Sequence, residues 1–341
     1  MLAEYIKFYY GALSELKKKI YVTLYRGFKD KQKNIDINVD ISAISSEEIY
    51  EIITSVYNDT PSFYYLKATS ISIAIMLNGY RVFPEYIYSN EQIREFDRRL
   101  EIGLQTFCRK YIQHGMSDYQ KEIIIHDFLV KTIKYDHEAA NSIIPQIDEA
   151  YNVIGALLKR RAVCWGIACA FKLLCDYCKV KSFVVIGDTK PKLGSAGHAW
   201  NMVNLDGESY HVDVTWDIKE KGDISFCYDY LNLDDGLIHL DHSWESTLYP
   251  KCTSNRYNYY FLNRLYVKSV VKLTEYITQK LNFGEKYIVI KFANTMPTNS
   301  EIENAVKLSF YNYVAGGRYN LEIRYNLKIS DKTHNIYIEV L

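Results

Sequence analysis

Residues 160–178, with the sequence RRAVCWGIACAFKLLCDYC, decide how the central part of the chain folds. From Cys164 onward, apolar side chains recur at the i, i+3, i+4, i+7 spacing of one helix face, at Ile167, Ala168, Phe171, Leu174, Cys175 and Cys178. The spacing predicts a helix that begins at Cys164. A thiol in the first turn of a helix lies at the positive end of the helix dipole, beside unpaired backbone N–H groups, and both favour the thiolate.

The segments after this helix have the pattern of β-strands, at residues 182–188, 198–205 and 208–216. Asp206-Gly207 joins the last two and is a strong hairpin signal. A two-residue turn there places His198 and Asp213 on one face as diagonal neighbours. A turn one residue earlier would make them face each other directly, whereas a three-residue loop would separate them.

The second strand of this hairpin alternates between polar and apolar residues. The polar face holds Ser209, His211, Asp213 and Thr215, and the apolar face holds Tyr210, Val212, Val214 and Trp216. We expect the apolar face to pack in the core and the polar face to be exposed or to line a site. A nucleophilic cysteine needs a base and a group that orients the base. An aspartate against one ring nitrogen of a histidine fixes the tautomer, and His198 and Asp213 have the residue types for these two roles.

Three blocks of the sequence together resemble a known family. They are SDYQKEIIIHDFLVKTIKYD, AYNVIGALLKRRAVCWGIACAFKLLCDYC and GHAWNMVNLDGESYHVDVTWD, and they span about a third of the chain. In this order they resemble the transglutaminase-like superfamily of papain-type cysteine enzymes, which we assign to its bacterial type. The resemblance implies an α+β core in which the helix that carries the cysteine packs on an antiparallel sheet. It also implies that Cys164 is the nucleophile, His198 its base and Asp213 the residue that orients His198.

The resemblance is incomplete. Bacterial members often have Gln after the cysteine, whereas Trp165 follows it here, as in animal transglutaminases. The calcium sites and flanking β-domains of the animal enzymes have no visible counterpart. Family members bind the tetrahedral oxyanion with the backbone N–H of the nucleophile, which lies among the unpaired N–H groups if Cys164 starts a helix, and with a second donor. For the second donor the sequence offers only Tyr135 and Tyr151.

Three segments are predicted along the chain, an N-terminal helical and β-hairpin unit at 1–105, the transglutaminase-like core at 106–250 and a small α/β domain at 251–341. The first contains a helix over 3–26, a helix from Ser45 to Tyr57 and a hairpin at Asn78-Gly79. Ser89 with Gln92 and Ser117 with Gln120 have capping-box spacing, so a helix should follow each. In the last segment we predict a helix over 266–282, a strand, a helix from Ser300 and two strands around Ser330-Asp331.

The composition restricts the partners that we expect. The 341 residues contain 41 Lys and Arg against 41 Asp and Glu, so no net charge favours nucleic acid or an acidic membrane surface. The N-terminus has no signal-peptide or transmembrane pattern. The seven cysteines are odd in number and dispersed, which favours reduced thiols and a cytoplasmic protein. We predict no cofactor and no metal, and the sequence gives no oligomeric state.

Several residues allow more than one interpretation of their role. Cys169, Cys175 and Cys178 are expected to pack in the core, although Cys175-x-x-Cys178 and His239-x-x-His242 could together form a zinc site. His211 could line the site or be an exposed strand residue. Trp200 could form a wall of the site or lie in the core.

The predicted function is a cysteine-dependent amide hydrolase that uses Cys164, His198 and Asp213 through a thioester, with a protein or peptide amide as substrate. Nothing in the sequence marks a dry site or an amine channel, which favours water as acceptor. A protein-glutamine cross-linking transglutaminase and a non-catalytic binding or scaffold protein remain the alternatives.

Overall fold

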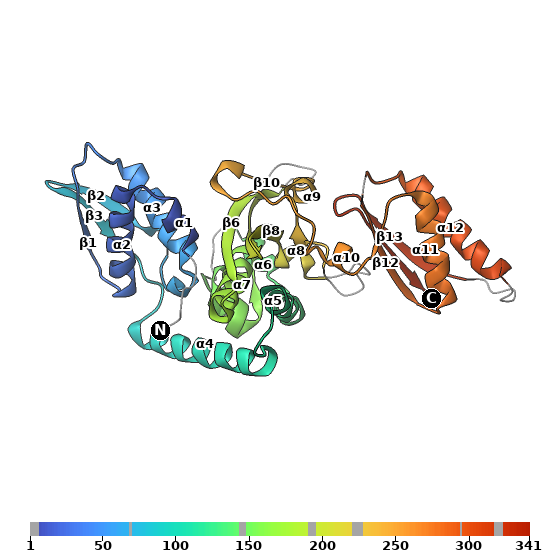
Figure 1. Ribbon diagram of the computed structural model, residues 1–341. Coiled ribbons are helices and arrows are strands. Elements are labelled where there is room, and N and C mark those ends of the chain that lie inside the picture. Colours follow the sequence, from blue (N-terminus) through green and yellow to red (C-terminus); the bar gives the residue numbers. More distant parts are fainter. Residues whose placement is uncertain are drawn as a thin grey trace. The chain divides into compact units, whose positions relative to one another are not determined.

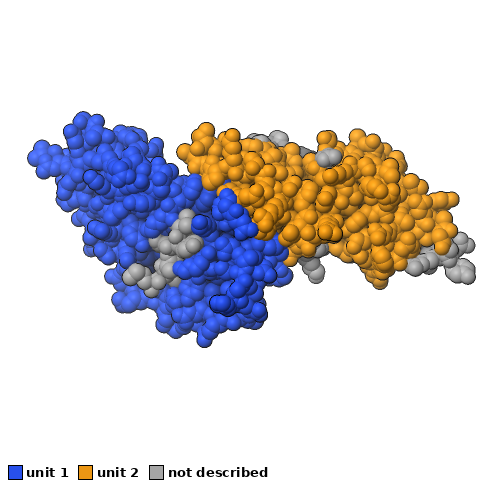
Figure 2. Space-filling view, viewed as in Figure 1, with its two compact units in different colours: residues 1–186, 197–207 blue, residues 187–196, 208–341 orange. Residues whose placement is uncertain are grey.

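The computed structural model describes residues 7–67, 70–142, 148–189, 196–219, 228–293, 295–316 and 323–341, and these form a mixed α+β structure, as predicted (Figure 1). Two compact units are distinguished, a first unit of residues 1–186 with 197–207 and a second unit of residues 187–196 with 208–341 (Figure 2). The predicted segment boundaries at residues 105 and 250 stay a prediction. None of the helices in the described ranges is long and apolar enough to span a bilayer.

The N-terminal part of the first unit has helices next to a small sheet. Its elements are α1 Phe8–Ala12, α2 Glu15–Lys29, β1 Ile35–Asn38, α3 Ser46–Asp59, η1 Pro61–Phe63, β2 Ser72–Met76 and β3 Gly79–Phe83, with strand order β1-β3-β2. The predicted hairpin is present, but Gly79 pairs with Met76, so the turn is formed by Leu77 and Asn78. The helix predicted from Ser45 is confirmed, with Ser45 as the N-cap of α3. The single helix predicted over 3–26 is wrong within the described residues, because Ser14 accepts a hydrogen bond from the N–H of Lys17 and starts a new helix.

Capping chemistry sets the next helices. Both predicted capping boxes are present, with Ser89 before α4 (Asn90–Tyr111) and Ser117 before α5 (Asp118–Thr132). Short elements then lead to α7 (Cys164–Cys178), and they are β4 Lys134–Tyr135, α6 His137–Asn141, η3 Asp148–Tyr151, the π-helix η4 Ile154–Lys159 and β5 Arg161–Ala162. The predicted start of a helix at Cys164 is therefore confirmed. From Gly166 onward nearly every residue of α7 is buried, so this helix lies in the core.

The central sheet has the strand order β10-β6-β7-β8-β9, with β6 Lys181–Thr189, β7 Ala196–Leu205, β8 Glu208–Val212, β9 Leu231–Leu233 and β10 His242–Trp244. The two-residue turn after β7 is confirmed, since Asp206 and Gly207 both have positive φ, 51° and 89°. The strand predicted to reach residue 216 is wrong beyond Val212. Asp213 caps a short helix, α8 (Val214–Asp217), by accepting hydrogen bonds from two of its backbone N–H groups.

The C-terminal part of the second unit has its own core, formed by apolar residues between Val267 and Ile338. Before it come α9 Asp235–Ile238, η5 Ser246–Leu248 and α10 Tyr259–Leu262, and it contains β11 Tyr266–Val267, α11 Val270–Asn282, β12 Tyr287–Phe292, α12 Asn299–Ala315, β13 Tyr325–Ser330 and β14 Asn335–Val340. The strand order is β11-β12-β14-β13. The predicted order of elements is confirmed, except that the helix begins at Val270, because Ser269 caps it and residues 266–267 are a strand.

Polar contacts join this C-terminal part to the rest of the second unit. The hydroxyl of Tyr260 and the amide of Asn335, which donates over 3.0 Å, both bond to the buried carboxylate of Asp229. The ammonium of Lys332 lies 5.1 Å from the ring centroid of Trp216, on α8. The loop between β13 and β14 is therefore in contact with the helix that Asp213 caps.

Candidate functional site

Cys164 is the first residue of α7 and is half-buried. The backbone before it is fixed, because Val163 donates its N–H to the carbonyl of Ala150 and accepts the N–H of Ile167. Within the described chain, no side chain caps the first turn of α7 and no acidic residue lies in it. The thiol thus lies at the positive end of a buried helix without a competing carboxylate, beside a backbone N–H that can bind an oxyanion.

The other cysteines of α7 are packing residues, as predicted. Cys169, Cys175 and Cys178 are buried. Burial raises the pKa of Cys169 to about 12 and the pKa of both Cys175 and Cys178 still further above the ordinary thiol value. Cys178 lies 3.5 Å from Cys108, sulfur to sulfur. Six of the seven cysteines are described and all six are free thiols, while Cys227 lies outside the described residues.

Trp165 follows Cys164 and is held by aromatic and aliphatic packing. Its ring stacks on Tyr57 at 5.5 Å between centroids, and it packs on Ala168, Val184 and Ala199. The indole Nε1 is buried and has no hydrogen-bond partner among the described residues. A buried N–H group without an acceptor costs free energy. The indole N–H of Trp165 is therefore an unsatisfied donor directly after Cys164, the residue predicted to be the nucleophile.

The two tyrosines considered as oxyanion donors have other contacts. Tyr151 donates its hydroxyl proton to the carbonyl of Ala139 over 2.9 Å, which makes it a poor donor to a substrate. Tyr135 packs edge-on against His137, with 4.9 Å between ring centroids. A role for Tyr135 stays a prediction.

His198 lies on β7, and this strand is anchored on α7 inside the first unit. The side-chain amide of Asn201 donates to the carbonyl of Ala168 over 3.1 Å. His198 itself is 8% exposed, and its ring stacks on Trp200 at 5.8 Å between centroids. Trp200 is buried, so it is a core residue that also supports the imidazole. Helix and strand thus hold Cys164 and His198 in one compact unit.

Asp213 belongs to the second unit and is fully buried. Its Oδ1 accepts hydrogen bonds from the backbone N–H groups of Thr215, at 2.9 Å, and Trp216, at 3.2 Å. Its own backbone N–H donates to the carbonyl of Tyr230 over 3.0 Å. Asp213 is thus a rigid N-cap rather than a strand residue. Trp216 is half-buried on α8, and the prediction that it lies in the core is therefore wrong.

The structure adds His242, which the sequence suggested only as a zinc ligand. Its Nε2 lies 3.1 Å from Oδ2 of Asp213, and its Nδ1 lies 2.5 Å from Oδ1 of Asp241. The hydroxyl of Tyr230 donates to the other oxygen of Asp241 over 2.6 Å. Burial by itself lowers the pKa of His242, but the hydrogen bonds that its ring donates to Asp213 and Asp241 outweigh burial and raise the pKa above the ordinary histidine value.

The zinc alternative gains no support from these contacts. Both ring nitrogens of His242 face carboxylates, and His239 stacks on Trp244 with 4.0 Å between centroids. Cys175 and Cys178 are buried thiols of α7, as described above. The sequence singled out His242 only through the spacing His239-x-x-His242, and nothing in that pattern connects His242 with Asp213.

His211 is buried, so the prediction of an exposed strand residue is wrong. Its Nε2 lies 2.9 Å from Oδ1 of Asp235. Together with Cys252, the donor atoms of these residues lie within 4.8 Å of one another, so this cluster has the residue types of a metal site. Burial lowers the pKa of His211 despite the carboxylate of Asp235, and it raises the pKa of the Cys252 thiol.

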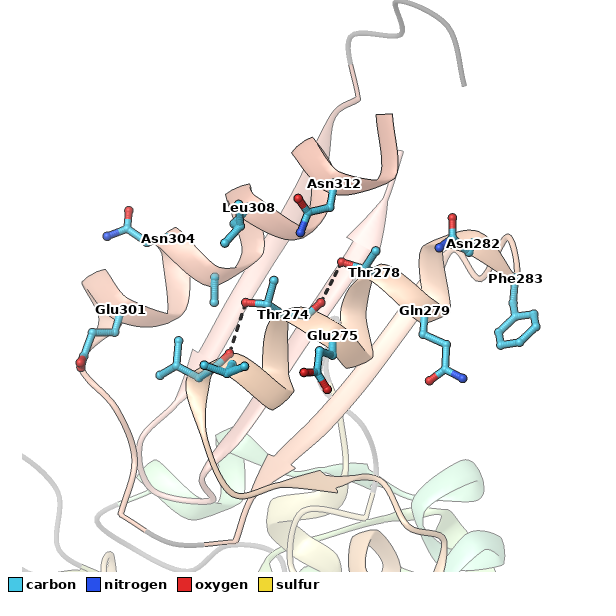
Figure 3. A pocket seen from close by; sticks show the side chains of 13 residues that line it. Thr274, Glu275, Thr278, Gln279, Asn282, Phe283, Glu301, Asn304, Leu308 and Asn312 are labelled. Atoms are coloured by element: carbon cyan, nitrogen blue, oxygen red, sulfur yellow. Dashed lines mark hydrogen bonds between the residues drawn. The ribbon is translucent and has the colours of Figure 1, made fainter. Parts of the chain in front are cut away.

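A large hollow lies elsewhere, between α11 and α12 (Figure 3). It measures about 860 Å³, and the residues that line it include Thr274, Thr278, Leu308 and the carboxylates Glu275 and Glu301. Its lining contains no cysteine, histidine or lysine. The hollow therefore offers neither a thiol nucleophile nor an imidazole base.

Comparisons with known proteins agree with the sequence motifs. Residues 105–214 match the model of the transglutaminase-like superfamily. Over 122 residues the chain is 29% identical to the kyphoscoliosis peptidase of Mus musculus, a match that covers 33% of this chain and 18% of the mouse protein. The chain thus spans less than a fifth of the length of that relative.

Two solved structures show weaker likeness. One is described as the crystal structure of a TGase, with 13% identity, a TM-score of 0.32 and coverage of 55% of this chain and 51% of that one. The other is a cysteine protease candidate from Cytophaga hutchinsonii, with 13% identity, a TM-score of 0.25 and coverage of 43% and 61%.

Proposed function

We propose that this chain, whose residues 105–214 form a transglutaminase-like domain, is a cysteine-dependent amide hydrolase that acts on a protein or peptide. The observation that carries the proposal is the position of Cys164. Its thiol stands at the uncapped first turn of a buried helix, in the same compact unit as His198. Backbone N–H groups at such a helix start can bind the oxyanion that forms when the sulfur attacks a carbonyl.

In the proposed reaction the Cys164 thiolate attacks the amide carbonyl and forms a carbon–sulfur bond. His198, which holds the proton taken from the thiol, gives it to the leaving amine as the carbon–nitrogen bond breaks. A water molecule then loses a proton to His198 and attacks the thioester, which releases the carboxylic acid and restores the thiol. Asp213 accepts a hydrogen bond from the other ring nitrogen of His198 and orients it.

Hydrolysis is favoured over transfer to an amine by one comparison, since the matched mouse protein is named as a peptidase. In the alternative reaction, a lysine amine replaces water and the product is a cross-linked protein. The two outcomes share the thioester and differ only in the acceptor, so one experiment separates them.

The test uses the full chain and three variants, Cys164→Ser, His198→Asn and, as matched control, Cys108→Ser, which removes another half-buried thiol. A panel of glutamine-containing peptides is incubated with and without a primary amine, and new amino termini, ammonia and amine incorporation are followed. New amino termini that depend on Cys164 and His198 but not on Cys108 support the hydrolase. Amine incorporation with ammonia release indicates the transglutaminase.

A second measurement covers the non-catalytic alternative. Iodoacetamide is reacted with the chain between pH 5 and pH 8, and the modified Cys164 peptide is quantified. We expect fast alkylation already at pH 6, because the rate follows the thiolate fraction. If Cys164 reacts like an ordinary thiol and no peptide is processed, the proposed function is wrong and a binding protein is indicated.

A further inference from the structure

We propose that His242 is a positioning residue for Asp213: held as an imidazolium between Asp213 and Asp241, it fixes the carboxylate in the orientation that His198 needs. This inference rests on the proposed function, in which Asp213 orients His198. It concerns contacts inside the second unit only, where Asp213, His242, Asp241 and Tyr230 all lie.

The first step concerns the freedom of the Asp213 side chain. Both backbone hydrogen bonds of the α8 cap reach Oδ1, from Thr215 and Trp216. Rotation about the last side-chain bond of an aspartate is soft, and it moves both oxygens of the planar carboxylate together. The bond from Nε2 of His242 to Oδ2, at 3.1 Å, opposes this rotation from the other side of the carboxylate. These three bonds use three of the roughly four acceptor positions of a carboxylate, and we assign the fourth to His198.

The second step concerns what holds His242. Asp241 accepts from its Nδ1 at 2.5 Å and is itself held by the hydroxyl of Tyr230 at 2.6 Å. The rings of Trp216 and Tyr230 pack on the imidazole, with 4.6 Å and 5.8 Å between centroids. Tyr230 is fixed in turn, because its N–H donates to Asp217 and its carbonyl accepts from Asp213. Both nitrogens and the ring plane of His242 are thus determined by neighbours, as a supporting layer requires.

The third step concerns charge. An ionised carboxylate only accepts hydrogen bonds, so an imidazole between two carboxylates must donate from both nitrogens and is then a cation. The raised pKa of His242 agrees with this state. All three side chains are almost completely shielded from solvent. A cation between the two carboxylates offsets their repulsion, and this pairing is what makes a buried carboxylate at position 213 tolerable.

The test separates the two bonds of His242 with a matched pair of variants. In His242→Gln the amide nitrogen takes the place of Nε2, which faces Asp213. In His242→Asn it takes the place of Nδ1, which faces Asp241. Both variants are neutral amides, so a merely structural role would make them alike. The readout is the rate of Cys164 alkylation by iodoacetamide from pH 5 to pH 8 in the full chain.

We expect His242→Gln, which loses the positive charge but keeps the bond to Asp213, to slow the reaction at pH 6 less than His242→Asn. His242→Asn loses both and should slow it by about 10- to 100-fold, the effect of losing one hydrogen bond to a charged group. Equal rates for the two variants would overturn the positioning role. Asp213→Asn is measured beside them. If Asp213→Asn leaves the alkylation profile unchanged, the proposed function itself fails, and this failure is distinct from equality of the two His242 variants.

A measurement on the unaltered chain covers the case in which a variant does not fold. In a chain labelled with ¹⁵N-histidine, the His242 signal should show both ring nitrogens protonated at pH 7. A neutral His242 at this pH would contradict the inference without any substitution.

Discussion

His211 and His242 lie in the same unit, both are fully buried, and both bond to an aspartate, yet their pKa values shift in opposite directions. One carboxylate, that of Asp235, faces His211, and burial prevails and lowers its pKa. Two carboxylates face His242, and together they outweigh burial and raise its pKa. The difference teaches that the balance between burial and the number of carboxylate partners decides in which direction the pKa of a buried imidazole shifts.

The largest expected effect is on the rate of peptide hydrolysis, and it distinguishes Asp213, the partner of His242, from Asp235, the partner of His211. Asp213→Asn should lower the rate of peptide hydrolysis by roughly 10²- to 10⁴-fold, since an amide in this role cannot hold the base in its correct tautomer. Asn still caps α8, so folding should be preserved. The matched variant Asp235→Asn next to His211 should leave hydrolysis nearly unchanged. Equal losses in both variants, measured as kcat/KM, would remove the functional distinction between the two regions.

A second effect concerns the pKa of the imidazoles. Asp241→Asn removes one of the two carboxylates at His242, so the pKa of His242 should fall towards the behaviour of His211. Asp235→Asn should lower the pKa of His211 further. An NMR titration of the histidine ring signals measures both. If the pKa of His242 stays raised in Asp241→Asn, then the second carboxylate is not its cause.

A smaller effect concerns the free energy of unfolding, to which His242 and His211 should contribute with opposite pH dependences. The folded pKa of His242 lies above its unfolded value of about 6.5. Its stabilising contribution is therefore complete below pH 6.5 and is lost as the pH rises through the folded pKa. The folded pKa of His211 is lowered, so its burial costs stability as the pH falls below 6.5.

Urea unfolding at pH 5.5 and pH 8.5 measures this pair. The loss of stability in His242→Gln should be larger at pH 5.5, and the loss in His211→Gln should be larger at pH 8.5. The same sign for both variants would contradict the comparison.

The smallest effect concerns the aromatic ring beside His242. The ring of Trp216 contacts both that imidazole and the ammonium of Lys332. Lys332→Met should lower the free energy of unfolding by about 0.5–1 kcal/mol, the value of an exposed cation–π contact. Lys307→Met on the exposed face of α12 is the control and should have less effect. A loss in Lys332→Met no larger than in the control would show that the contact adds nothing to stability.

Local signals in the sequence predicted much of the fold. The serines that cap α4 and α5, the turn at Asp206-Gly207 and the start of α7 at Cys164 all depend on partners within about four residues. For this reason a short window of sequence contains the full interaction. The predicted strand beyond Val212 failed because its alternating pattern competes with the capping bonds of Asp213, and a pattern of polarity does not show which backbone N–H groups a side chain reaches.

The sequence by itself determined a transglutaminase-like segment, the residue types of a thiol, an imidazole and a carboxylate, and the helix that presents Cys164. Only the tertiary structure decided that His242 lies against Asp213, 29 residues away in the chain, and that two carboxylates raise its pKa despite its burial. The physical reason is that a local pattern records hydrogen bonds and packing between near neighbours. The charge of a buried group instead depends on every ionised side chain that the fold brings to it, whatever its distance in sequence.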